Sequence, residues 1–292
     1  MSDITYRWAA ASDVGRSRDN NQDSLFPLGS GSGPGPLIFA VADGLGGLEA
    51  GEVASRLAIE AATAAPADDE AVSLVDRLKA GHDAVVEFVL GSPDVIESAT
   101  TLTLARVDVD GMLEVAHVGD SRLYASGDEV FYRVTTDQTV AQRKLDAGEI
   151  SELEATLDPG RHILTSACGL DDLNIQHLAG IQLGPGERIL LCSDGLTEMV
   201  SDGEIGWVLA GQSDPSETVT WLIDAANSAG GVDNITVIVV TVEAAAPEPV
   251  RPDFPGWEKE HGIDHADFLD ALHNPDDPLH EVALRSSRPG SE

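Results

Sequence analysis

The sequence predicts an α+β protein with mostly antiparallel sheets and with helices packed on the outside of those sheets. Three observations lead to this prediction. Most strand-like segments occur in pairs joined by short polar turns, as in hairpins. Few strand–helix–strand units occur, which argues against a doubly wound parallel sheet. Amphipathic helical patterns lie between the groups of strands.

The expected strands are continuous or alternating apolar runs. Residues 37–43 form a continuous apolar run, typical of a buried strand, which ends at Asp43. Residues 101–122 alternate in polarity around a turn at 108–111 and predict a hairpin whose second strand ends at Asp120. The other expected strands are a hairpin over 122–135 that turns about residues 126–128, a strand in 188–195 ending at Asp194, and a strand over 233–242 that begins at Asp233.

Three helices are expected between these strands. Residues 51–64 and 70–90 each place apolar side chains on one face. Residues 214–231 begin with Asp214 as N-cap and Pro215 in the first turn, and they stop at a glycine pair. The polar segment 137–175 predicts short helices in an insertion over one edge of the fold.

Composition narrows the classes of function. The chain has 292 residues, of which 42% are hydrophobic, and its formal net charge is −34. So acidic a surface repels nucleic acid and anionic membranes. No apolar run reaches transmembrane length, and the N-terminus has no signal-peptide pattern. Two cysteines without CxxC spacing fit a reducing cytoplasm.

The composition changes after Val242. Residues 243–256 carry four prolines, and the residues after them are acidic. We therefore expect one folded domain over 3–245 and, over 246–292, an acidic proline-containing linker and tail that is disordered or loosely docked.

The glycine-rich turn in residues 41–55, VADGLGGLEAGEVAS, resembles a phosphate cradle but opens with the carboxylate of Asp43 and has no lysine after the glycines. Either this segment is only a tight turn, or a positive charge lies between Asp43 and an anionic substrate.

Asp43, Asp120, Asp194 and Asp233 each stand at the end of a predicted strand. Each alone is more often a turn residue. Sheets bring strand ends together, so the four could converge, and a hard divalent cation would then offset their repulsion. Oxygen-only ligands favour Mg²⁺ or Mn²⁺ over Zn²⁺. Asp43 would then hold the cation that faces the phosphate, and Gly44 would let its own carbonyl group approach.

Residues 16–24 add Arg18 and Asp23. An arginine can bind a phosphate through two parallel N–H donors. The alternative is a surface salt bridge from Arg18 to Asp19 or Asp23, and this segment taken alone favours that alternative.

Six segments taken together resemble the ordered motifs of the metal-dependent protein phosphatases (PPM, or PP2C-type) of bacteria. They are RDNNQD, VADGLGG with GEVAS, ATTLT, HVGDSR, LLCSDGL and GGVDNITV, and the resemblance covers about residues 5–242. It implies a four-layer α-β-β-α sandwich of two mostly antiparallel sheets flanked by helices. It also implies hydrolysis of phosphoserine and phosphothreonine in proteins by attack of a metal-bridging hydroxide, which counteracts Ser/Thr kinase signalling.

The resemblance also implies roles for individual residues. Asp43 would bridge two metal ions, Mn²⁺ or Mg²⁺, and Gly44 would contribute its carbonyl group. Asp194 and Asp233 would complete one site, and Asp23 would act through metal-bound water. Asp120, with Asp194, would serve a third and weaker site. Arg18 would clamp the phosphate, and residues 137–175 would form a flap that helps to admit substrates.

The chain departs from the family pattern at several positions. Leu45 and Leu48 stand where relatives have a histidine, so no histidine general acid can be assigned, and Ser166 replaces an arginine that is common in the flap. Gln22 replaces a glutamate of animal relatives.

Two other functions could use the same fold or the same kind of ligands. A catalytically weak phosphoprotein-binding regulator of the same fold is one alternative, although the principal acids are present. A carboxylate–metal nuclease is disfavoured by the net charge of −34. The expected partners are phosphoproteins and a cognate Ser/Thr kinase system, with neither nucleic acid nor a membrane span. We expect a cytoplasmic monomer.

Overall fold

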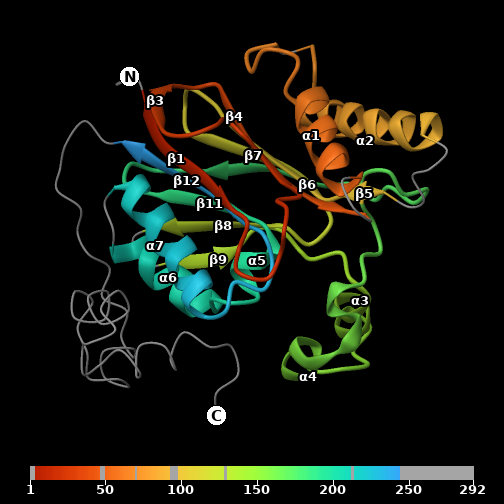
Figure 1. The fold of residues 1–292 in the computed structure, drawn as a ribbon. Coiled ribbons are helices and arrows are strands. Elements are labelled where there is room, and N and C mark those ends of the chain that lie inside the picture. Colours follow the sequence, from red (N-terminus) through yellow and green to blue (C-terminus); the bar gives the residue numbers. More distant parts are fainter. Residues whose placement is uncertain are drawn as a thin grey trace, which may run out of the picture.

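Two six-stranded sheets pack face to face in the computed structural model (Figure 1). The structure describes residues 4–46, 50–69, 71–92, 98–127, 130–211 and 214–243. Part of the glycine-rich turn, with Leu48, and the predicted tail from residue 246 onward lie outside the described residues.

The first sheet, named the β12 sheet here, has its neighbouring strands in the order β3 (Gly31–Pro34), β1 (Thr5–Asp13), β12 (Ile235–Glu243), β11 (Arg188–Cys192), β8 (Arg122–Gly127) and β9 (Val130–Arg133). The second, the β4 sheet, has the order β10 (Gln176–Gln182), β7 (Met112–Val118), β6 (Leu102–Val107), β4 (Leu37–Leu45) and β2 (Asp23–Phe26), and β5 (Ala99–Thr100) pairs with β4. Every described strand pair is antiparallel, as the hairpin patterns predict.

Helices cover the outer face of each sheet. The β4 sheet is covered by α1 (Ala50–Ala62) and α2 (Leu74–Gly91), and the β12 sheet by α6 (Asp202–Gly211) and α7 (Pro215–Ser228), so the layers run α-β-β-α (Figure 1). The helix α7 begins as predicted, because Asp214 is its N-cap and accepts a hydrogen bond from the amide of Ser216. The four-layer sandwich is therefore confirmed.

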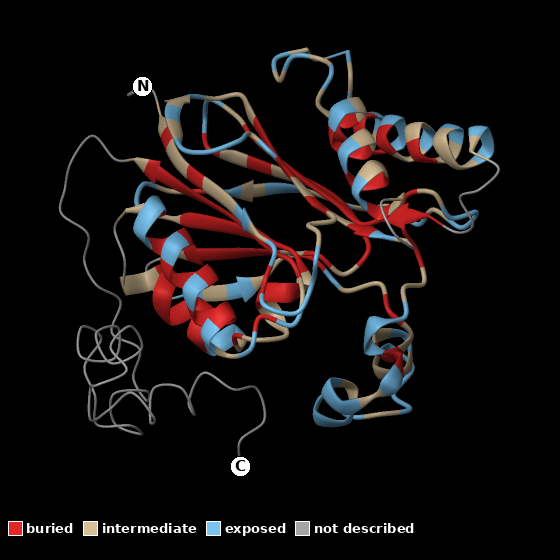
Figure 2. Ribbon diagram, viewed as in Figure 1, coloured by how far each residue is buried: buried red, intermediate tan, exposed pale blue. Residues whose placement is uncertain are grey.

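The central strands are buried on both faces, which explains their continuous apolar sequences. In β4, Phe39 and Val41 pack between the sheets, whereas Ala40 and Ala42 pack toward the helices. The strand β12 follows the same rule, with Ile238 between the sheets and Val239 toward α7. Figure 2 shows these strands as almost entirely buried. Strands covered on both faces lose the alternation of polar and apolar residues.

The segment 137–175, named the flap here, extends away from the sandwich. It contains α3 (Val140–Asp146), α4 (Glu152–Leu157) and the 3-10 helix η1 (Pro159–His162), so the prediction of short helices is confirmed. In Figure 2, α4 is almost entirely exposed, whereas α3 is mostly half-buried. The chain segments that enter and leave the flap run side by side, because Thr139 pairs with Leu164 in an antiparallel bridge.

Several elements differ from the sequence predictions. The strand β11 ends at Cys192, and Asp194 is instead the first residue of the short helix α5 (Asp194–Thr197), so the prediction that Asp194 ends a strand is wrong. The strand β7 ends at Val118, two residues before Asp120. Five strands and one long helix were not predicted: β1, β2, β3, β5, β10 and α6. Within the described ranges, no helix has both the length and the apolar composition needed to cross a membrane.

Candidate metal centre

Five aspartates converge at one end of the sandwich. Asp23 begins β2, and Asp43 lies opposite it near the end of β4. The other three lie in the connections that follow β7, follow β11 and precede β12: Asp120, Asp194 and Asp233. The electrostatic environment of Asp43 includes all four of the others, so the predicted convergence of strand ends is observed. Both sheets contribute, which places the cluster across the seam between them.

The backbone around Asp43 is held by two threonines. The Asp43 amide donates to Thr101 Oγ1 at 2.8 Å, and the Thr101 amide donates back to the Asp43 carbonyl oxygen at 2.9 Å. The same carbonyl oxygen accepts a hydrogen bond from the Thr100 hydroxyl at 2.9 Å. Both threonines are buried. The position of Asp43 is therefore determined by the ATTLT segment, a link that the sequence alone does not reveal.

Gly44 is required by the close approach of neighbouring backbone. A Cβ atom at this position would overlap the carbonyl oxygens of Gly51 and Gln22. The Gly44 amide donates to the Gln22 carbonyl oxygen at 3.1 Å. Only glycine lets the start of α1 and the segment before β2 pack this tightly beside Asp43.

Asp23 and Asp194 each bury a carboxylate oxygen that has no partner among the described protein atoms. Asp23 Oδ2 accepts a hydrogen bond from Ser193 Oγ at 2.7 Å, but Asp23 Oδ1 and Asp194 Oδ1 are buried without a hydrogen bond. Burial, and then the neighbouring carboxylates, raise the pKa of Asp23 to about 7. Burial and Asp233 raise the pKa of Asp194 to about 6.

Arg18 lies beside the cluster as its cationic neighbour. Its Nη2 atom is 2.6 Å from Asp233 Oδ2, and the guanidinium group also lies in the field of Asp194 and Asp43. The Arg18 side chain is half exposed. The structure thus pairs Arg18 with Asp233, and the alternative salt bridge to Asp19 or Asp23 is not the one observed.

Asp120 lies close to Asp194 at the edge of the cluster. Burial, followed by the charges of Asp194 and Asp137, raises its pKa well above the ordinary value. Asp137 itself is paired with Arg122, whose Nη2 is 2.7 Å from Asp137 Oδ2. The Asp137–Arg122 pair therefore neutralises a carboxylate that would otherwise add to the negative charge around Asp120.

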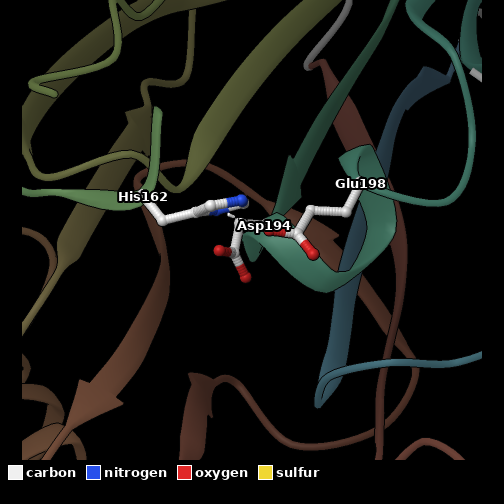
Figure 3. A group of neighbouring side chains, drawn as sticks. All are labelled: His162, Asp194 and Glu198. Atoms are coloured by element: carbon white, nitrogen blue, oxygen red, sulfur yellow. Dashed lines mark ion pairs between the residues drawn. The ribbon is translucent and has the colours of Figure 1, made fainter. Parts of the chain in front are cut away.

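The flap adds a histidine that sequence reasoning did not assign. His162, the last residue of η1, points toward Glu198, with Nδ1 2.7 Å from Glu198 Oε1 (Figure 3). Asp194 lies beside this pair, and one potential ligand atom from each of the three residues lies within 4.8 Å of the others. Burial lowers the pKa of His162, whereas burial and the charge of Asp194 raise the pKa of Glu198 to about 7.

The positions that depart from the family motifs have ordinary structural roles. Leu45 is partly exposed, and Ser166 is buried, where its hydroxyl donates to the Asp172 carbonyl and accepts from the Asn174 amide. Gln22 donates from its backbone amide to Asn234 Oδ1 at 2.8 Å. His117 is buried, and its two ring nitrogens contact Thr103 Oγ1 and the Gly119 carbonyl oxygen.

Comparison with known proteins identifies the family. Residues 15–223 match the family model described as Protein phosphatase 2C. The chain belongs to the protein phosphatase 2C family. This result confirms the resemblance predicted from the six motifs, and the curated relatives below are bacterial.

Two curated relatives and one solved structure are especially similar. The chain is 36% identical over 243 residues to the serine/threonine protein phosphatase PstP of Mycobacterium tuberculosis, covering 82% of this chain and 45% of PstP. It therefore spans about half the length of that relative. It is 30% identical to protein phosphatase PhpP of Streptococcus pneumoniae, covering 79% of this chain and 95% of PhpP. The crystal structure of the PstP catalytic domain in complex with two manganese ions superposes with a TM-score of 0.72, at 35% identity, over 82% of this chain and 100% of that domain.

Proposed function

We propose that this protein is a metal-dependent phosphatase that hydrolyses phosphoserine and phosphothreonine in proteins. The observation that carries the proposal is the convergence of five aspartates, with Arg18 beside them, at one end of a protein phosphatase 2C fold. The relatives PstP and PhpP are named as phosphatases, which supports the same assignment.

The donor set fits a pair of hard divalent cations. All the candidate side-chain ligands are carboxylates, and two of their buried oxygens have no hydrogen-bond partner in the described part of the chain. Burial, and then the repulsion of neighbouring carboxylates, raise the pKa values of Asp43 and Asp194, and bound cations would relieve that repulsion at neutral pH. The proposed ligands of two Mn²⁺ or Mg²⁺ ions are Asp43, the Gly44 carbonyl group, Asp194 and Asp233, with Asp23 acting through water. Asp120, together with Asp194, is proposed for a third and weaker site. The PstP complex with two manganese ions supports this choice of metal.

When bound, the cation pair supplies Lewis acidity that activates water and neutralises charge on the phosphoryl group. The residues of the chain position the ligands. Asp43 and Thr101 fix the ligand geometry, because the peptide groups on both sides of Asp43 are hydrogen-bonded to Thr101. The thiol of Cys192 is a poor nucleophile, because it is buried and burial raises its pKa.

Arg18 binds the phosphoryl oxygens of the substrate in this proposal. Its guanidinium group is half exposed and one of its N–H groups reaches Asp233, so other donors can face an incoming phosphate. In a chain with a formal net charge of −34, this local positive charge is needed to attract an anionic substrate.

The flap lies where it can influence the approach of protein substrates. His162 joins it to Glu198 beside Asp194, so a phosphopeptide that enters the site passes near η1. We further propose that the substrates are phosphoproteins made by a Ser/Thr kinase system. A monomer is sufficient because one chain supplies every proposed site residue, and two free cysteines fit a reducing cytoplasm.

The experiment that tests the proposal is hydrolysis of p-nitrophenyl phosphate and of a phosphothreonine peptide. We expect activity with Mn²⁺ or Mg²⁺ and its loss in EDTA. The Asp194→Asn variant serves as the inactive control and also traps phosphoproteins from a lysate. Full turnover in chelator, or no turnover with either metal ion, would contradict the proposal.

A further inference from the structure

Gln138, the second residue of the flap, holds Gly119 through two reciprocal hydrogen bonds. The Gln138 amide donates to the Gly119 carbonyl oxygen at 2.8 Å. The Gly119 amide donates to the Gln138 side-chain Oε1 at 3.0 Å. Since Gly119 directly precedes Asp120, these bonds fix the backbone from which the Asp120 side chain departs.

The surroundings of Gly119 leave its backbone little freedom. Its φ angle of +107° is favourable only for glycine, and a Cβ atom there would collide with the Thr101 side chain. The Gly119 carbonyl oxygen also lies 3.1 Å from His117 Nε2, which must donate because a carbonyl oxygen only accepts. Among these contacts, the hydrogen bond from the Gly119 amide to Gln138 Oε1 is the one that links Gly119 to a side chain of the flap.

The same glutamine also binds the rest of the flap. The backbone carbonyl oxygen of Gln138 accepts hydrogen bonds from the Thr165 amide at 2.8 Å and from the Thr165 hydroxyl at 3.0 Å. Its side-chain Nε2 donates to the Asn174 carbonyl oxygen at 2.8 Å. Gln138 thus joins the C-terminal part of the flap to the backbone beside Asp120. Its side-chain Oε1 binds Gly119 and its Nε2 binds Asn174.

A polar cavity of about 340 Å³ lies next to this junction. Its lining includes Gln138, Thr165 and Asn174 of the junction, and Gln142 of α3. Gln142 offers a matched comparison, because its side-chain amide donates only to Asp146 on the same helix among the described contacts. Both glutamines face the same cavity, but only Gln138 reaches Gly119.

We propose that Gln138 is a positioning residue that couples the flap to Asp120, so that the orientation of the Asp120 carboxylate depends on where the flap is held. This inference rests on the proposed function, because it concerns a carboxylate proposed to bind a cation. Loss of the Gln138 side-chain amide frees the Gly119 amide and lets the Asp120 carboxylate turn away from Asp194. Asp43, by contrast, is held by Thr101, which does not belong to the flap.

The test compares Gln138→Met with Gln142→Met in the full chain. Isothermal titration with Mn²⁺ is performed on wild type and Asp120→Asn first, to identify the binding event that depends on Asp120. We expect Gln138→Met to weaken that event at least fivefold, to leave the tighter Mn²⁺ binding within twofold, and to speed hydrogen exchange of the Gly119 amide at least tenfold. Gln142→Met should match wild type in all three measurements.

Several results would overturn the coupling. One is an unchanged Mn²⁺ isotherm in Gln138→Met. Another is a loss of the Asp120-dependent Mn²⁺ binding that is equal in Gln142→Met and Gln138→Met. The third is identical Mn²⁺ isotherms for wild type and Asp120→Asn. If Gln138→Met does not fold, Gln138→Glu carries the test, because it keeps the acceptor for the Gly119 amide and removes the donor to Asn174. It should retain the Asp120-dependent binding, and loss of that binding would overturn the proposal. A wild-type protein that binds Mn²⁺ but hydrolyses no phosphoester would refute the proposed function and leave the coupling measurable.

Discussion

Asp23 and Asp43 face each other directly across the antiparallel pair of β2 and β4. Like charges in such opposed positions are destabilising in a sheet. The two residues nonetheless lie in a cluster with three further aspartates, and the pKa values of both are raised. The fold therefore holds a repulsive arrangement that a bound cation would stabilise, and the first two predictions follow from this relationship.

Neutralising one member of the cluster should stabilise the protein in chelator and abolish its response to metal. We expect Asp43→Asn to raise Tm in EDTA, because one repulsive charge is removed. In wild type, Mn²⁺ at a hundred times its Kd should add about 2.7 kcal/mol to the free energy of unfolding, and Asp43→Asn should lose this gain. The control is Asp83→Asn on the exposed face of α2. A lower Tm of Asp43→Asn in EDTA would contradict the prediction.

The stability of the metal-free protein should fall as the pH rises from about 4 to about 7. The pKa values of Asp23 and Asp194 are raised from 3.8 to about 7 and about 6, so over this range the folded state binds more protons than the unfolded state. Under that condition the free energy of unfolding decreases with pH. Urea unfolding in EDTA at pH 5 and pH 8 measures the change, and Asp23→Asn should reduce it. A stability that is flat or that increases over this range would show that the folded state does not raise the pKa values of these carboxyl groups.

Replacing Arg18 should separate substrate binding from metal binding. Arg18→Ala removes a phosphate contact and frees Asp233 from its ion pair, so we expect a higher KM with Mn²⁺ affinity unchanged or improved. Arg18→Lys keeps the charge but not the paired donors, and it should restore KM only in part. Calorimetric loss of Mn²⁺ binding in Arg18→Ala would instead assign Arg18 a structural role at the metal centre.

Thr101 should matter for the metal centre as well as for stability. Thr101→Val leaves the Asp43 amide without its acceptor at a buried position, at a cost of about 1–3 kcal/mol in the free energy of unfolding. We expect weaker Mn²⁺ binding in addition. Thr103→Val is the matched control, because this buried hydroxyl binds His117 and Ser121 rather than Asp43. Equal Mn²⁺ affinities in the two variants would show that Thr101 only supports the fold.

His162 should affect large substrates more than small ones. His162→Ala removes the contact between η1 and Glu198 and so loosens the flap at the site. We expect kcat/KM to fall at least fivefold more for a phosphothreonine peptide than for p-nitrophenyl phosphate, because only the peptide is long enough to meet the flap. An equal fall for both substrates would place the effect of His162 in the chemical step.

The central strands and the acidic residues beside them are evident from the sequence. Strands such as β4 and β12 pack on both faces, so their apolar runs are continuous, with Asp43 near the end of β4 and Asp233 two residues before β12. Strands without a long continuous apolar run were harder to predict. The strand β10 is largely exposed and β1 is rich in alanine, and their strand conformation depends on pairing with β7 and β12.

The sequence by itself determined the family, the layered fold and the aspartates of the candidate site, because local apolar periodicity and ordered motifs are written in consecutive residues. The tertiary structure alone decided the partners of those residues. It assigned Arg18 to Asp233, Gln138 to Gly119 and His162 to Glu198, and it placed Asp194 at the start of a helix rather than the end of a strand. Each of these contacts joins segments that are distant in sequence, so it depends on strand register and on the position of the flap, which local patterns of polarity do not specify.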